Sequence, residues 1–370
     1  MTAVQRPAEI DSEHMRRALE LARLGWGQTA PNPMVGAVVV AGGTVVGEGY
    51  HARYGDAHAE VVALRHAGAH ARDATLYVSL EPCAHFGKTP PCTEAIIAAG
   101  VARVAAAVRD PSAVARGGAE MLRAAGIQVD LGIEVEQALE LNAAFFNAHS
   151  SDRPWVVLKL AVSADGAIAD ASRRPRSITG PASRKEVHHL RAGFDAIGVG
   201  VGTVVTDNPA LTVRGVPAPR VAPTRVIFDS TLRTPIDSIV VRTARDIPTL
   251  IVTRDPDESK QHALEEAGAT IITASSTPEA LRQLRQRDIR SLFVEGGAKL
   301  AGTLIADDLV DRLIIFQSPI ELGSGALEAF AHSPPGFSES LEGRPIVERR
   351  LIGDDTMTIY ALHEISCLPG

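Results

Sequence analysis

The stretch from Thr75 to Cys92, TLYVSLEPCAHFGKTPPC, and the tripeptide His58-Ala59-Glu60 upstream of it decide the fold of the first half of this chain. Cys83, Cys92 and His58 offer two thiolates and one imidazole, which are ligands suited to zinc. Three protein ligands leave the fourth tetrahedral position open for water, as in catalytic rather than structural zinc sites. We therefore expect a catalytic zinc centre on these three residues.

A closed structural site would need a fourth ligand. Cys367 is the only other one of the three cysteines in the chain, and it stands far downstream. Four histidines are closer in sequence, so a closed structural site with a fourth protein ligand remains an alternative: His51, His66, His70 and His85. Buried cysteines can also be plain apolar core residues. Two of three cysteines in one short loop argue against that interpretation.

The order of these residues indicates a class of reaction. His-x-Glu followed by Pro-Cys and a further Cys is typical of zinc-dependent base deaminases, whose glutamate moves protons and does not bind the metal. Glu60 is that glutamate, and we expect it to take a proton from water and return protons to the ring nitrogen and the leaving ammonia. The alternative is a surface carboxylate, which a helix N-terminus also favours.

Composition limits the remaining classes of function. A chain of 370 residues predicts two domains, because a single core rarely grows beyond about 250–300 residues. With 45% hydrophobic residues and a net charge of −7, the chain is an ordinary globular protein without a basic surface for nucleic acid or membranes. We expect a cytoplasmic protein, because cysteines are few and neither a signal peptide nor an apolar run of roughly 18 residues is present.

Apolar periodicity predicts an α/β sandwich over residues 1–150. Asp11 or Ser12 should cap a first helix that stops at Gly25, and a hairpin should join 34–40 to 45–49. The remaining expected segments are helices at 58–67, 92–100, 119–126 and 134–147 and strands at 75–80 and 101–108. A domain boundary is expected between 148 and 153, so the second domain should span 151–370.

Residues 151–370 predict a second α/β domain with a mainly parallel sheet. The expected strands are 154–160, 196–199, 225–228, 249–252, 270–272, 291–294 and 312–316, with helices at 181–193 and from Ala298 onwards. Glu295-Gly296-Gly297 ends one strand and opens a helix, where free amides can bind a pyrophosphate. The glycines between 198 and 203 are a weaker signal, because glycines after a strand often only form a turn.

These motifs resemble those of the bifunctional riboflavin-biosynthesis deaminase–reductases over nearly the whole chain. The matching segments are Asn32-Pro33-x-Val35-Gly36, Gly49-Tyr50-His51, His58-Ala59-Glu60, 81–92, Leu158-Lys159-Leu160-Ala161, 200–214, Asp229-Ser230 and Glu295-Gly296-Gly297. The resemblance implies a cytidine-deaminase-like αβα sandwich followed by a dihydrofolate-reductase-like α/β domain. It also implies zinc, NADPH, a small pyrimidine ribotide as substrate, and a homo-oligomer, either a dimer or a tetramer.

The resemblance further implies roles for individual residues. Deaminase substrate contacts would be Asn32, His51, Lys88 and Asp110, and reductase substrate contacts would be Arg191, Leu211, Arg214 and Glu295. Cofactor contacts would be Ala161, Ser177, Thr203, Asp207, Ser230, Gly297, Ala298, Lys299, Leu300, Ala301, Gly302 and Thr303. Hydride would go to C1′ of the ribosyl unit and give the ribityl product.

The chain departs from the family at two positions. Asp110-Pro111 is followed by Ser112-Ala113 instead of Asn-Pro, one residue short. Ser177-Ile178-Thr179-Gly180 replaces the usual Trp-Ile-Thr-Ser and follows the run Arg173-Arg174-Pro175-Arg176. These arginines could bind a phosphate of NADPH or of the ribotide, or form a solvated loop. Lys88 likewise could meet a phosphate or face water.

Two rival functions remain at this point. One is a nucleic-acid-editing deaminase with a binding module, which the acidic charge, the 4% aromatic content and the long loop between the cysteines oppose. The other is a deaminase whose second half only mediates assembly, which NADPH binding would exclude.

Overall fold

The computed structural model describes residues 7–88, 90–173 and 176–366, and these form two compact units. The first unit contains residues up to 150 together with 365–366, and the second contains 151–364. Each unit has its own sheet and its own hydrophobic core. Arg174 and Cys367, which were singled out above, lie outside the described residues.

The first unit is built on a five-stranded sheet in the order β2-β1-β3-β4-β5. Its strands are β1 (Gly36–Ala41), β2 (Thr44–Tyr50), β3 (Thr75–Val78), β4 (Arg103–Ala106) and β5 (Gln128–Leu131). β1 runs antiparallel to both of its neighbours, whereas β3, β4 and β5 are parallel. The expected hairpin is confirmed, and β5 is an additional edge strand.

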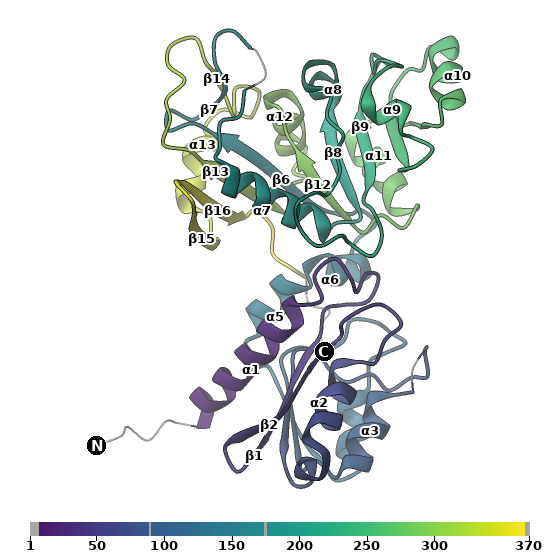
Figure 1. Cartoon of the computed structure of the whole chain (residues 1–370), viewed down its shortest axis with the longest axis vertical. Coiled ribbons are helices and arrows are strands. Elements are labelled where there is room, and N and C mark those ends of the chain that lie inside the picture. Colours follow the sequence, from purple (N-terminus) through teal and green to yellow (C-terminus); the bar gives the residue numbers. More distant parts are fainter. Residues whose placement is uncertain (1–6, 89, 174–175, 367–370) are drawn as a thin grey trace. The chain divides into compact units, whose positions relative to one another are not determined.

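Helices cover both faces of this sheet (Figure 1). They are α1 (Pro7–Arg23), α2 (Ala59–Ala67), α3 (Cys92–Ala99), α4 (Gly118–Ala124), α5 (Val135–Leu141) and α6 (Ala143–Ser150), with a 3₁₀ turn at Gly68–Ala71. Val39 and Leu76 pack with α2, α3 and α4, whereas Val38 and Tyr77 pack with α1, α5 and α6. Successive side chains of a strand point to opposite faces, so the predicted three-layer sandwich is confirmed.

The predicted cap of the first helix is wrong. α1 already begins at Pro7, and Asp11 lies inside it. The Asp11 carboxylate accepts hydrogen bonds from Arg103 at 2.8 and 2.7 Å and from the Tyr77 hydroxyl at 2.7 Å. A carboxylate with partners on the neighbouring strands has no need to cap its own helix.

The expected helix over 134–147 is broken at Asn142, which separates α5 from α6. The buried Asn142 side chain accepts a hydrogen bond from the Met34 amide at 2.8 Å and donates one to the Met34 carbonyl at 2.9 Å. Met34 precedes β1 in a stretch without regular structure, so its backbone groups need partners from elsewhere. The bend in the helix places Asn142 where it can supply both.

The second unit contains a nine-stranded sheet in the order β11-β10-β9-β8-β12-β6-β13-β16-β15. Its strands are β6 (Trp155–Val162), β8 (Ala196–Gly200), β9 (Thr224–Phe228), β10 (Thr249–Thr253), β11 (Thr270–Thr273), β12 (Ser291–Glu295), β13 (Arg312–Gln317), β15 (Ile346–Ile352) and β16 (Asp355–Ala361). All pairs from β11 to β13 are parallel, as predicted. The antiparallel hairpin of β15 and β16 was not predicted.

Helices again pack on both faces of the larger sheet. They are α7 (Pro181–Ala192), α8 (Val201–Asp207), α9 (Ile239–Arg242), α10 (Glu258–Glu266), α11 (Thr277–Arg285), α12 (Ala298–Ala306) and α13 (Phe337–Ser340). A small ribbon pairs β7 (Ala167–Ala169) with β14 (Leu327–Glu328), and a 3₁₀ turn spans Leu341–Gly343. In the described residues, none of the helices combines the length and apolar character that crossing a bilayer requires.

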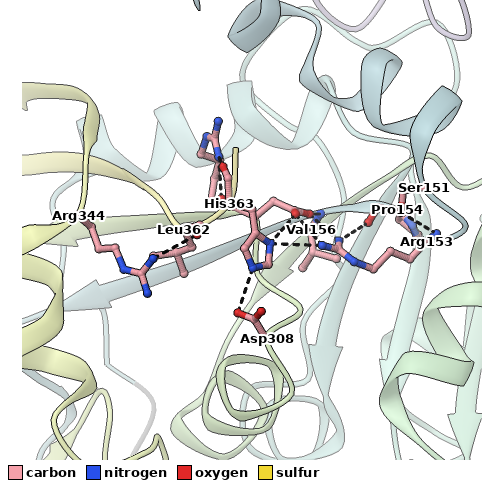
Figure 2. Close-up of polar contacts among 10 residues, drawn as sticks. Ser151, Arg153, Pro154, Val156, Asp308, Arg344, Leu362 and His363 are labelled. Atoms are coloured by element: carbon pink, nitrogen blue, oxygen red, sulfur yellow. Dashed lines mark hydrogen bonds and ion pairs between the residues drawn. The ribbon is translucent and has the colours of Figure 1, made fainter. Parts of the chain in front are cut away.

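A charged network ties the beginning of the second unit to its end (Figure 2). Both Arg153 Nη atoms donate to the Asp311 carboxylate at 2.7 Å, and the Val156 amide donates to it at the same distance. The His363 ring contacts Asp311 at 3.1 Å and Asp308 at 3.0 Å. Asp311 is 3% exposed and Arg153 19%, so the ion pair is largely shielded from water.

We predict that Asp311→Asn destabilises the second unit by about 3 kcal/mol, because it leaves the Arg153 guanidinium buried without its counter-charge. Urea unfolding of the full chain, followed by the fluorescence of Trp155 on β6, measures the loss. Asp307→Asn, at a neighbouring exposed carboxylate, is the matched control and should change stability by less than about 0.5 kcal/mol. Equal stability of the two variants would contradict this role for the network.

The same network predicts a pH dependence. Asp311 raises the pKa of His363 above its ordinary 6.5. The stabilisation by protonated His363 is therefore fully present below pH 6.5 and is lost as the pH rises through the folded-state pKa. Between about pH 5.5 and 8.5, the urea midpoint of the second unit should fall more steeply for the unsubstituted chain than for His363→Gln. Parallel profiles would show that His363 contributes no charge to folding.

Candidate active sites

Three side chains with zinc-binding atoms converge in the first unit. His58 caps α2, Cys92 is the first residue of α3, and Cys83 stands in the loop after β3. The His58 Nδ1 atom lies 3.2 Å from Cys92 Sγ and 3.6 Å from Cys83 Sγ. In the described part of the chain, the potential metal cluster comprises these three residues, and its ligand atoms lie within 4.8 Å of one another. His51, His66, His70 and His85 are not members of it.

The chemistry of this donor set fits zinc. A hydrogen bond from the Cys92 thiol and one from His58 lower the pKa of Cys83 to about 4, although burial opposes the shift. The same contact with Cys83, together with burial, raises the pKa of Cys92. The lowered pKa of Cys83 favours its thiolate form beside the His58 imidazole, which suits the binding of a cation.

Glu60 lies beside this cluster but outside it. It occupies the first turn of α2 and is 3% exposed, and its Oε2 atom has no hydrogen-bond partner among the described residues. Burial raises the pKa of Glu60, and the nearby His58 only partly offsets the effect. A buried, unpaired carboxylate oxygen next to metal ligands is suited to accept a proton from a water or a substrate.

Two expected substrate contacts of this unit, His51 and Asn32, lie next to the metal ligand candidate His58. The His51 ring packs edge-on against His58 with centroids 5.3 Å apart, and Asn32 Nδ2 lies 3.3 Å from His51 Nε2. Lys88, in the loop between the cysteines, holds its ammonium 4.1 Å from the centre of the Tyr54 ring. This cation–π contact is a third option for Lys88 that was not considered from sequence.

Glu81 is a buried residue of this site that sequence reasoning did not single out. Its carboxylate accepts hydrogen bonds from the backbone amides of Asp110, Gly117 and Ala119 at 3.2, 3.2 and 2.9 Å. It thereby fixes the segment that carries Asp110, whose pKa burial raises to about 6. The sequence feature that could have identified Glu81 is a carboxylate directly after an apolar strand. A charged group at such a position is expected to be buried only with specific partners. Gly118 completes the loop, because any side chain there would strike the Pro82 carbonyl.

The second unit contains a cavity of about 680 Å³ above the carboxyl ends of its parallel strands. Eight of the expected cofactor contacts line it: Thr203, Asp207, Ser230, Gly297, Ala298, Lys299, Leu300 and Thr303. Gly202 and Gly297 stand in the first turn of α8 and at the cap of α12, where free backbone amides suit phosphate oxygens. The two glycine-rich segments therefore meet at one cavity.

Four other expected cofactor contacts are not among the lining residues: Ala161, Ser177, Ala301 and Gly302. Ala301 packs in the core beneath α12, and a side chain at Gly302 would strike the backbone of His332. Ala161 lies on β6 opposite Phe316 of β13. Arg173 and Arg176 do line the cavity, and Arg176 lies 3.9 Å from the Asp170 carboxylate.

A second charge cluster, largely shielded from water, joins the end of β12 and the middle of β6 to α7. Arg191 Nε donates to Glu295 at 2.5 Å and Arg191 Nη1 donates to the Thr212 carbonyl at 2.8 Å, while Lys159 Nζ lies 4.0 Å from Glu295. Burial opposes ionisation of Glu295, but Arg191 and Lys159 keep its pKa below the ordinary value. Burial also lowers the pKa of Lys159. Sequence reasoning quoted Lys159 only within a motif, although a lysine inside an apolar strand is itself a signal.

The remaining expected substrate contacts lie on the segment that Arg191 holds. Leu211 is 3% exposed and adopts a positive φ of 49°, a conformation that is uncommon for a residue with a side chain. The Arg214 amide donates to His188 Nδ1 at 3.2 Å. Burial raises the pKa of Asp207, which ends α8 at the cavity.

Comparisons with known proteins match both units of the chain. Residues 8–108 match the cytidine and deoxycytidylate deaminase zinc-binding region, and residues 154–340 match the RibD C-terminal domain. The riboflavin biosynthesis protein RibD of Aquifex aeolicus is 43% identical over 86% of this chain and 89% of its own length. The Escherichia coli protein of the same name is 41% identical over 93% of this chain and 99% of its own.

Solved structures show the same relationship. Acinetobacter baumannii RibD superposes with a TM-score of 0.82 at 34% identity and covers 96% of this chain. The Thermotoga maritima diaminohydroxyphosphoribosylaminopyrimidine deaminase/5-amino-6-(5-phosphoribosylamino)uracil reductase also has a TM-score of 0.82, at 33% identity and with 96% coverage of this chain. Each comparison covers 99% of the solved chain. With both sites in place and relatives above 40% identity along most of its length, the chain belongs to the RibD family of riboflavin biosynthesis proteins.

Proposed function

We propose that this chain catalyses two reactions of riboflavin biosynthesis. The first unit hydrolytically deaminates a diaminopyrimidinone ribotide with the help of zinc, and the second uses NADPH to reduce the ribosyl group of the resulting uracil ribotide to ribityl. The observation that carries the proposal is the unpaired Glu60 oxygen beside the His58, Cys83 and Cys92 cluster. The cavity and the Lys159–Glu295–Arg191 cluster of the second unit support the reductive half.

The first reaction replaces a carbon–nitrogen bond by a carbon–oxygen bond and releases ammonia. Zinc held by His58, Cys83 and Cys92 would supply an activated water at the amine-bearing carbon. Glu60 accepts the proton of the attacking water and passes protons to the ring nitrogen and then to the leaving amine. Burial raises the pKa of Glu60, which favours uptake of the proton from the attacking water.

The surrounding side chains position the pyrimidine. Asn32 and His51 provide hydrogen-bonding groups within 3.3 Å of each other beside the metal ligands. Glu81 accepts a hydrogen bond from the Asp110 amide and so holds the backbone there. The buried Asp110 carboxylate is thereby kept in place at the site. Lys88 offers a positive charge for the ribotide phosphate at the rim.

The second reaction adds a hydride to C1′ and opens the ribose ring. NADPH bound in the cavity would supply the hydride. Breaking the bond between C1′ and the ring oxygen requires a proton on that oxygen, and Lys159, which lies 4.0 Å from Glu295 and is largely shielded from water, is suited to donate it. The negative charge of Glu295 offsets the positive charge of Lys159, and Arg191 orients the Glu295 carboxylate.

The oligomeric state and the cellular location are also proposals: we propose a homo-oligomer in the cytoplasm. Both thiols in the described residues are free cysteines, which suits a reducing compartment. A second unit that only mediates assembly would not need its own cavity and charge cluster. The net charge of −7 disfavours a nucleic-acid-editing deaminase.

We predict that Glu60→Gln keeps about one zinc per chain but lowers the rate of ammonia release at least about a hundredfold, because an amide cannot carry the proton. Reduction of already deaminated substrate, followed as NADPH oxidation, should continue. Glu94→Gln, an exposed residue in the first turn of α3, is the matched control and should keep both activities. Loss of zinc from Glu60→Gln would show that Glu60 is a ligand.

We predict the opposite phenotype for Lys159→Met. Ammonia release should continue, while NADPH oxidation falls at least about a hundredfold because the ring oxygen receives no proton. Glu295→Ala should behave in the same way, and the uracil ribotide should accumulate. Lys185→Met, at an exposed position of α7, serves as the control. Parallel loss of both activities in a folded Lys159→Met variant would contradict independent sites.

A further inference from the structure

Helix α7 connects the cavity of the second unit to its charge cluster. Ile178, three residues before the helix, lines the cavity. Near the other end of the helix, Arg191 pairs with Glu295. About one turn earlier, His188 Nδ1 accepts a hydrogen bond from the Arg214 amide at 3.2 Å. The place of α7 therefore decides where these groups stand relative to one another.

The first turn of α7 lacks a cap of its own. Gly180 is the N-cap residue of the helix, and it has no side chain that could accept a hydrogen bond. Pro181 follows it and has no amide hydrogen. Donor groups at the start of a helix have no partner within the helix, and the side chain of the N-cap residue usually satisfies one of them. The acceptor for the start of α7 must therefore come from another part of the chain.

A carboxylate from the β15–β16 hairpin supplies that acceptor. Asp355 is the first residue of β16, and its Oδ2 atom accepts hydrogen bonds from the Gly180 amide at 2.8 Å and from the Ser183 hydroxyl at 2.6 Å. Asp355 is 2% exposed, and Ser183 is fully buried. In a capping box, a side chain at the third helical position accepts a hydrogen bond from the amide of the N-cap residue. Ser183 holds that position but donates its hydroxyl, so Asp355 takes the accepting role.

The hairpin that carries Asp355 contacts α7 at two further points. A Cβ atom at Gly353, in the turn between β15 and β16, would come within 3.3 Å of Ala182 Cβ. Arg350 Nη2 donates to the Glu186 carboxylate at 2.6 Å. Figure 1 shows α7 beside both strands. These contacts fall on the first half of the helix, so the hairpin fixes the end of α7 that leads to the cavity.

We propose that Asp355 is a positioning residue for the reduction, because it provides the cap that Gly180 lacks and so holds α7 in place. This inference rests on the proposed reductase function. Asp355 is not among the residues that line the cavity, so it acts through α7 and not by contact with a ligand. Without this carboxylate, the first turn of α7 loses its acceptor, and Ile178 and the Arg191–Glu295 pair lose a fixed place. A displacement of about 1 Å can slow an enzyme about a hundredfold, so the cap affects the rate as well as the stability.

The test measures reduction of the uracil ribotide by the full-length, zinc-loaded protein. Asp355→Ala should lower kcat/KM for the ribotide at least about tenfold, while ammonia release by the first unit stays unchanged. Asp257→Ala is the matched control, because Asp257 caps α10 of the same unit and is not among the residues that line the cavity. This control should lower the urea midpoint of the second unit, as the loss of a helix cap does, but leave kcat/KM for reduction unchanged.

A second substitution replaces the cap locally. Serine is among the preferred N-cap residues, and a Cβ atom at Gly180 would meet only Asp355 Oδ2, at an ordinary contact distance of 3.6 Å. Gly180→Ser in the Asp355→Ala background should therefore restore kcat/KM to within about threefold of the unsubstituted protein. Ser183→Ala removes one of the two hydrogen bonds and should cause a smaller loss of the same kind. It provides the same test if Asp355→Ala does not fold.

Three results would overturn the proposal. Unchanged kcat/KM in both Asp355→Ala and Ser183→Ala would show that the cap has no part in reduction. Equal losses in Asp355→Ala and Asp257→Ala would reduce the role of Asp355 to general stability. A loss that Gly180→Ser does not reverse would exclude capping as its cause. Failure of the proposed function is a separate outcome, because the unsubstituted protein would then not reduce the uracil ribotide with NADPH.

Discussion

The convergence of two helix N-termini on the loop after β3 is the constraint on which the deaminase site depends. His58 at the cap of α2 and Cys92 at the start of α3 approach to 3.2 Å because both helices pack on the same face of the five-stranded sheet. Gly47 and Gly49 permit the close contact, since a side chain at either would strike the backbone of α2. The positions of His58 and Cys92 are therefore set by the packing of the sandwich.

Both units contain buried carboxylates that are held by specific hydrogen-bond or ion-pair partners. In the first unit, Glu81 satisfies three backbone amides, while Glu60 keeps an oxygen without a partner. In the second unit, Glu295 is held between Arg191 and Lys159. Glu81 and Glu295 thus position the backbone or other side chains, whereas Glu60 keeps an unpaired oxygen where the proposed reaction moves a proton. Unpaired buried groups are costly to keep, which is why they point to function.

Much of this arrangement could be predicted from the sequence. The clustering of His58, Cys83 and Cys92 and both α/β architectures follow from spacing and apolar periodicity, which are local. The break at Asn142, the partners of Asp11 and the role of Glu81 could not be predicted, because each depends on a hydrogen bond to a residue far away in the chain. The hairpin of β15 and β16 was missed for another reason: β15 is an exposed edge strand, so burial leaves little pattern in its sequence.

The central claim is an open, catalytic zinc site with three protein ligands and Glu60 outside the coordination shell. X-ray absorption spectroscopy at the zinc edge of the purified full-length chain tests it most directly. We expect about one zinc per chain, bound by two sulfur atoms, one imidazole nitrogen and one oxygen from water, with an unchanged protein shell in the Glu60→Gln variant. A shell of four protein sulfur and nitrogen ligands would contradict the account, because no position would then be open for the attacking water.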